Sequence, residues 1–123
     1  MNGDDERRVL VLTGTRAEYG LLRSSMAAIR DREGLALQVV ATGMHLSPRH
    51  GRTVEEIRED GFAVDREVLM QVEGDTGKAM AKSLGLGTSG LAEAFASLDP
   101  DVVLLLGDRD EALAGALAAA HMN

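Results

Sequence analysis

Four short apolar runs, separated by stretches with helical periodicity, constrain the fold of this chain more than any other feature. They are Arg8–Thr13, Leu35–Thr42, Val64–Met70 and Val102–Leu106. The first two are rich in β-branched residues, the third alternates only weakly, and the fourth is apolar throughout, as in a buried parallel strand. Strands that alternate with helices predict an α/β fold with a parallel sheet between flanking helices.

The stretches between these runs carry helix signals. Apolar residues recur at helical spacing over Glu18–Arg32, and Gly34 then ends this helix. A capping-box pattern at Thr53–Glu56 opens a short helix that Gly61 closes. A longer helix, capped by Asp75 or Thr76, extends to Leu98 and stops at Asp99–Pro100. The last helical pattern runs from Glu111 to Ala120, with helical character to Met122 and Asn123 as its C-cap.

The predicted arrangement is a Rossmann-like sheet in the strand order 3-2-1-4. Residues 1–123 form a single partial domain, in which residues 1–6 are a loose tail. An α/β chain normally continues from its last helix into another strand, and the sheet would otherwise keep an uncovered edge. The sequence is therefore predicted to be a fragment.

Composition excludes several function classes. The formal net charge is −7, which argues against nucleic acid or an anionic membrane as the partner, although a few local arginines can still hold a small anion. With no cysteine, the chain has no disulfide, thiolate zinc site or thiol nucleophile, and this usage fits a cytoplasmic protein. No apolar stretch approaches the roughly 20 residues of a membrane span.

One glycine motif matches a dinucleotide-binding pattern by its letters. Gly85–Gly90 reads G-x-G-x-x-G, but the stretch before it is helical, whereas that site needs a preceding strand. A kinked or broken helix is the better interpretation. No P-loop pattern occurs either, and no cofactor is expected.

The turn after the first strand is a candidate anion site. Gly14 would let a ligand approach the backbone, the helix N-terminus offers N–H groups, and Arg16 adds charge. The alternative is an ordinary turn in which Arg16 pairs with Glu18. In the predicted strand order this turn lies beside the residues Gly107–Arg109 at the end of the fourth strand.

Asp108 and Arg109 follow the fourth strand directly. A carboxylate beside an arginine at a strand end suits acid–base chemistry or polarisation of a substrate. Asp108 could equally cap the last helix, with Asp110 and Glu111 near its positive end. These acids make Mg²⁺ conceivable, but no second carboxylate cluster completes such a site.

A glycine-bounded loop holds His45 and His50 on either side of Pro48 and Arg49. Two histidines could ligate a metal, but catalytic zinc needs three protein ligands and no third is apparent. Histidines at the surface or lining a substrate site are the favoured interpretation, and no metal is expected.

Three segments together resemble the hydrolysing UDP-N-acetylglucosamine 2-epimerases of sialic-acid-type biosynthesis. They are Thr13–Leu22 (TGTRAEYGLL), Leu106–Ala114 (LGDRDEALA), and Gly43–Ser47 with Gly51, Thr53, Ile57, Asp60, Gly61 and Phe62. The non-hydrolysing relatives carry G-T-R-P-E, a nearby lysine and G-D-T. This chain has Ala17, Leu21 and Arg109 at those positions, so the hydrolysing branch is the better match.

The resemblance implies a GT-B-like enzyme whose C-terminal domain this sequence lacks. The family reaction eliminates UDP from a UDP-amino-sugar and then adds water, releasing an N-acetylmannosamine-type sugar. Carried over by position, Asp108 is the catalytic carboxylate, Arg16 and Arg109 meet the phosphates, and Gly20 and His45 line the ligand. Because further family carboxylates lie beyond this sequence, the 123-residue chain is expected to be inactive alone.

Two other function classes remain open. The chain could be a non-catalytic α/β module that self-associates, and a homo-oligomer is expected in either case. A receiver-like phosphoacceptor domain is a third class, but it needs an acidic pair after the first strand, where this chain has Gly14, Thr15 and Arg16.

Overall fold

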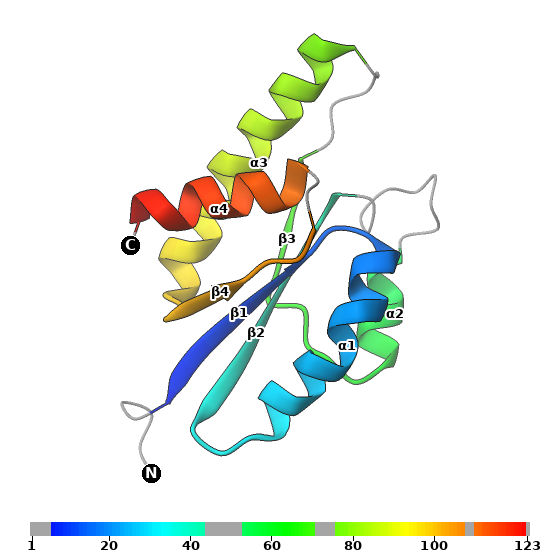
Figure 1. Cartoon of the computed structure of the whole chain (residues 1–123), viewed down its shortest axis with the longest axis vertical. Helices are drawn as coiled ribbons and strands as arrows, with labels where there is room; N and C mark the ends of the chain where they lie inside the picture. The colour runs from blue at the N-terminus through cyan, green and yellow to red at the C-terminus, as the bar shows by residue number, and fades with distance from the viewer. Residues whose placement is uncertain (1–5, 44–52, 71–75, 108–109, 123) are drawn as a thin grey trace.

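A computed structural model of the chain describes residues 6–43, 53–70, 76–107 and 110–122 (Figure 1). Its elements, in chain order, are β1 (Arg7–Thr13), α1 (Arg16–Asp31), β2 (Leu35–Thr42), α2 (Val54–Glu59), β3 (Arg66–Val68), α3 (Gly77–Leu98), β4 (Val102–Leu104) and α4 (Asp110–Met122). The four strands form one sheet in the order β3-β2-β1-β4, and every neighbouring pair is parallel. The predicted fold class and strand order are confirmed.

Helices cover both faces of the sheet, α1 and α2 on one side and α3 and α4 on the other (Figure 1). Alternate residues of β1 serve the two sides: Val11 joins the cluster under α1 and α2, whereas Leu10 and Leu12 join the cluster under α3 and α4. This two-sided burial explains why β1 and β2 read as continuous apolar runs rather than as alternating ones.

Two strands are shorter than their apolar runs. The third was predicted over Val64–Met70, and the structure pairs only Arg66–Val68 with β2. The fourth pairs with β1 over Val102–Leu104 and is only partly buried, with Val102 46% exposed. The prediction of a fully buried fourth strand is wrong because β4 lies at an edge of the described sheet.

The predicted break at Gly85–Gly90 is also wrong, because α3 continues as one helix through all three glycines. Two of them provide space for packing. A Cβ at Gly87 would lie 2.6 Å from the Met70 side chain, and one at Gly90 would lie 2.6 Å from Val68. The glycine motif therefore lets α3 approach the end of β3 closely, and it follows no strand as a dinucleotide site would.

The helix caps follow the sequence signals in part. Thr76 caps α3, its hydroxyl accepting the Ala79 N–H at 3.1 Å, and Asp99 ends that helix in the left-handed region with φ of 50°. The capping box predicted at Thr53 does not form: α2 begins there, but Thr53 is helical in conformation and its side chain makes no capping hydrogen bond. Within the described residues, no helix is both long enough and apolar enough to cross a bilayer.

Candidate functional site at the carboxyl ends of the strands

The carboxyl ends of β1, β2 and β4 converge at three glycines, Gly14, Gly43 and Gly107. Gly43 and Gly107 have φ of +62° and +96°, a conformation that residues with side chains rarely adopt. Gly14 follows β1 and Gly107 lies three residues beyond β4, and these two strands are paired, as the predicted order requires. This is the edge of an open α/β sheet where ligands bind.

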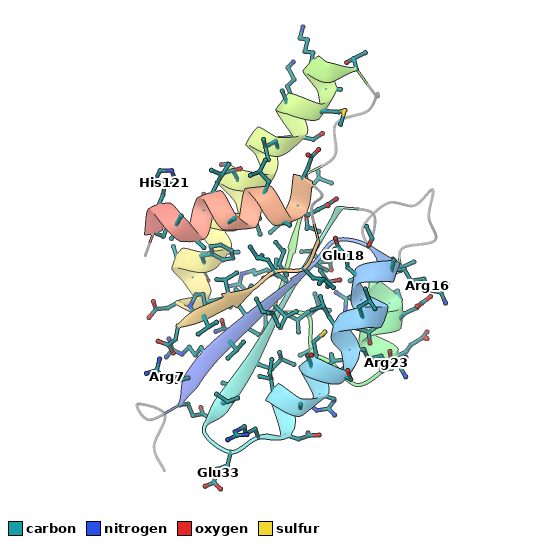
Figure 2. All side chains as sticks on the ribbon, in the orientation of Figure 1. Arg7, Arg16, Glu18, Arg23, Glu33 and His121 are labelled. Atoms are coloured by element: carbon teal, nitrogen blue, oxygen red, sulfur yellow. The ribbon has the colours of Figure 1, made fainter. Side chains whose placement is uncertain are left out.

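Glu18, from the first turn of α1, links these strand ends. Its Oε1 accepts the Gly14 N–H at 2.9 Å, and a Cβ at Gly107 would lie 3.4 Å from its Oε2. The hydroxyl of Thr15 accepts the Glu18 N–H at 3.2 Å and so caps α1, which is worth about 1 kcal/mol. Glu18 is only 9% exposed, and Figure 2 shows it turned toward the sheet, so the turn is held from inside.

A second buried carboxylate comes from α4. Glu111 is 6% exposed and lies against the backbone of two strand ends. A Cβ at Gly14 would lie 2.6 Å from its Cγ, and a Cβ at Gly43 would lie 2.7 Å from its Oε1. Only glycine at both positions leaves room for this side chain.

Arg16 takes a different partner from the one considered in the sequence. It does not pair with Glu18 but with Glu56 of α2, whose Oε2 accepts its Nε–H at 3.1 Å. Arg16 points outward beside α2 in Figure 2, and its side chain is 72% exposed. The guanidinium therefore stands in solvent at the first residue of α1.

Arg16 and Gly20, two of the residues predicted to bind substrate, line one hollow of about 510 Å³. Arg23 lies one further turn along the same face of α1 and completes its wall, together with Ala17, Tyr19 and Glu56. Outside the backbone and immediate neighbours of its own helix, no atom of the described residues lies within 4 Å of a Cβ placed on Gly20. The structure thus brings Arg16 and Gly20 together at the surface between α1 and α2.

Tyr19 fastens α2 to α1 below this hollow. Its hydroxyl donates a hydrogen bond to Asp60, whose carboxylate also lies 3.6 Å from Arg23. Burial, followed by this hydrogen bond and the charge of Asp60, raises the pKa of Tyr19 above its ordinary value of 10.0. The phenol therefore stays protonated in the folded protein at pH values where it would ionise in the unfolded chain.

We expect the stability to fall above about pH 10 because of Tyr19. Its raised pKa contributes stability that is complete below the unfolded value and is lost as pH rises toward the folded value, by up to about 1.4 kcal/mol per pH unit. Urea unfolding of wild type and Tyr19→Phe across this range measures the difference. Tyr19 is the only tyrosine and there is no tryptophan, so tyrosinate absorbance reports it alone. A folded-state midpoint at 10 would contradict the expectation.

Several residues singled out in the sequence lie outside the described residues, namely the candidate site residues Asp108, Arg109, His45 and His50, the loop residues Pro48 and Arg49, and the helix caps Asp75 and Asn123. Their predicted roles therefore remain predictions. Among the described residues, no three His, Asp or Glu side chains gather closely enough to hold a metal ion.

Two residues of the site were missed from the sequence, Glu18 and Glu111. Glu18 carried a usable signal, because Thr15–Glu18 has the same T-x-x-E capping-box pattern that was noted at Thr53. Glu111 carried none beyond its place near a helix start. Its burial depends on Gly14 and Gly43, which are far from it in the sequence.

Known proteins match both the sequence and this fold. The model of the family UDP-N-acetylglucosamine 2-epimerase matches residues 27–123. The UDP-N,N'-diacetylbacillosamine 2-epimerase (hydrolyzing) of Legionella pneumophila is 43% identical over 95% of this chain and 31% of that protein. The GDP/UDP-N,N'-diacetylbacillosamine 2-epimerase (hydrolyzing) of Campylobacter jejuni is 38% identical over 96% of this chain and 30% of that protein.

A solved structure shares the fold. The UDP-GlcNAc 2-epimerase from Neisseria meningitidis, crystallised with UDP-GlcNAc, superposes with a TM-score of 0.76 at 19% identity, over 94% of this chain and 30% of that one. The chain therefore spans about 30% of the length of the relatives it matches. The family match and the sequence identity establish that this chain belongs to the UDP-N-acetylglucosamine 2-epimerase family.

Proposed function

We propose that this chain is the N-terminal part of a hydrolysing UDP-N-acetylglucosamine 2-epimerase that acts on UDP-GlcNAc or a close UDP-amino-sugar. The observation that carries the proposal is the position of Arg16. It begins α1 after the turn Gly14–Thr15, at the edge of the sheet that holds the carboxyl ends of the paired strands β1 and β4, and its guanidinium is exposed. An open α/β sheet binds ligands at this edge, and an arginine beside a helix N-terminus suits a diphosphate.

The chemistry that follows is elimination of UDP and then addition of water. As the C1–O bond breaks, negative charge develops on the leaving diphosphate, and Arg16 and Arg109 are proposed to stabilise it. Asp108 is proposed to move the proton at C2. Gly20 and His45 are proposed to line the ligand. The two diacetylbacillosamine relatives support a UDP-amino-sugar substrate by their names, without choosing the sugar.

The complete GT-B-like enzyme would have a second domain that closes over this edge. Since residues 1–123 correspond to about 30% of the relatives' length, we propose that they form one partial domain without measurable epimerase activity alone. The reaction uses no added cofactor in this proposal, and it takes place in the cytoplasm.

The test is ligand binding and turnover by the purified 123-residue chain. UDP is expected to bind weakly, Arg16→Ala to weaken that binding by about tenfold, and UDP-GlcNAc to release no UDP. Uridine, which lacks the diphosphate, is the matched control, and its affinity should not depend on Arg16. Equal binding of UDP by wild type and Arg16→Ala would contradict the diphosphate site, and robust turnover would contradict the inactivity.

A second candidate is a non-catalytic module that self-associates. The observation that favours it is the exposed apolar side chains of α4 and the neighbouring α3, namely Leu113, Leu117, Met122, Met80 and Leu86. Light scattering during the UDP titration separates the two candidates. If the chain forms a homodimer both with and without UDP and binds no UDP, the result favours the module. Binding of UDP favours the N-terminal part of the enzyme.

A further inference from the structure

Glu56 is the acid that pairs with Arg16 among the described residues, and it comes from a different helix. Its Oε2 lies 3.1 Å from Arg16 Nε, across the hollow between α1 and α2. Residues 16 and 56 are 40 positions apart in the sequence. The pair forms only because α2 packs beside α1, so it is a property of the fold.

The geometry leaves part of Arg16 available. A guanidinium carries five N–H donors in a rigid fork, and the contact with Glu56 uses the donor at Nε. Among the described residues, no other hydrogen bond from Arg16 is found at its terminal nitrogens. The Nη1 and Nη2 edge can still bind a phosphate in a bidentate manner. Glu56 therefore holds the side chain while the phosphate-binding edge faces solvent.

Two other acids that the structure describes, in α1 and at the end of α2, already have partners. Asp60 accepts the hydrogen bond of Tyr19 and lies 3.6 Å from Arg23. Glu18 is turned inward and accepts the Gly14 N–H. Glu56, by contrast, is 43% exposed and lines the hollow, so its charge faces any anion that approaches Arg16.

We propose that Glu56 is a specificity-determining residue of the anion site, one that orients Arg16 through Nε and whose charge keeps the affinity for bare phosphate-type anions low. The inference rests on the proposed function, in which Arg16 contacts a diphosphate. An anion at Arg16 lies a few ångströms from this carboxylate and is repelled by it. A nucleotide sugar offsets that repulsion with its other contacts, but inorganic pyrophosphate has no others to make.

The experiment is a titration of the 123-residue chain with inorganic pyrophosphate, followed by NMR, including the Arg Nε–H signals. In Glu56→Gln the amide oxygen can still accept from Arg16 Nε, so orientation is kept while the charge is removed. Pyrophosphate affinity is expected to rise by about three- to tenfold at low salt. At about 0.5 M salt, where charges more than roughly 4 Å apart are screened, the gain should largely disappear.

Glu55→Gln is the matched control. Glu55 neighbours Glu56 on α2, is also exposed, and pairs with Arg58 at 2.9 Å instead of with Arg16. Glu55→Gln changes the net charge by the same amount as Glu56→Gln. Because Glu55 does not contact Arg16, the affinity of Glu55→Gln for pyrophosphate should rise by much less. The double variant Arg16→Ala/Glu56→Gln should lose most of the gain, because the gain depends on the anion being bound at Arg16.

The outcomes distinguish the two proposals. If Arg16→Ala weakens pyrophosphate binding but Glu56→Gln binds no better than Glu55→Gln, the role of Glu56 is overturned and the diphosphate site stands. If Arg16→Ala binds pyrophosphate as well as wild type, the diphosphate site itself fails. A gain that persists at high salt would also overturn the electrostatic role, since a structural rearrangement is not screened by salt.

Discussion

Replacing Gly43 with alanine is expected to destabilise the domain by about 3 kcal/mol. Gly43 has φ of +62°, where an L side chain costs roughly 1–2 kcal/mol. The new Cβ would also lie 2.7 Å from Glu111 Oε1 and 3.0 Å from the Gly14 carbonyl oxygen. The carbonyl belongs to the end of β1, so relief would require two strand ends to separate. Thermal unfolding should show a midpoint lower by about 10 °C or more.

Gly20→Ala is the matched control for Gly43→Ala. Gly20 lies inside α1, and a Cβ there would meet no atom within 4 Å. The same chemical change is expected to stabilise the domain by up to about 1 kcal/mol, because alanine favours a helix interior over glycine. Similar unfolding midpoints for the two variants would mean that the strand ends are not as tightly packed as the structure shows.

Leu91→Ala is expected to cost about 3 kcal/mol or more. Leu91 is fully buried and belongs to the cluster between the sheet and α3, with Leu10 and Val40 of the central strands. Removing its side chain loses apolar contacts and leaves a cavity that the surrounding strands cannot fill. The free energy of unfolding in urea, at an unchanged slope against urea concentration, measures this loss.

Leu86→Ala provides the comparison for Leu91→Ala. It makes the same substitution in the same helix at a side chain that is 48% exposed. Its cost should stay below about 1 kcal/mol. If both variants lost equal stability, the cost would not come from burial of the side chain, and α3 would not depend on its packing against the sheet.

Much of the fold could be predicted from local patterns. β2 matches its apolar run, Leu35–Thr42, residue for residue, and Gly34 marks the end of α1 with φ of +89°. The alternation of strands and helices predicted a parallel sheet, and the order β3-β2-β1-β4 is the one expected for a Rossmann-like unit. Strand ends were less certain, since pairing stops where a neighbour stops and not where an apolar run does.

The site was predicted in part for the same reason. Gly14 and Gly107 were expected side by side from the strand order, and the structure places both against the carboxylate of Glu18. Arg16 was expected at the edge with either a ligand or Glu18 as its partner, and the carboxylate that pairs with it in the structure is Glu56, not Glu18. A partner 40 residues away leaves no local sequence pattern. The inward orientation of the Glu18 side chain depends on the hydrogen bond that it accepts from the Gly14 N–H.

The sequence by itself determined the class of fold, the strand order and the family, because periodicity, glycines at strand ends and the segments around Gly14 and Gly107 are local properties. Only the tertiary structure decided which carboxylates face inward and which acid holds Arg16. Those choices depend on backbone groups and helices that meet through folding: Glu111 fits where Gly14 and Gly43 lack side chains, and Glu56 reaches Arg16 across two packed helices.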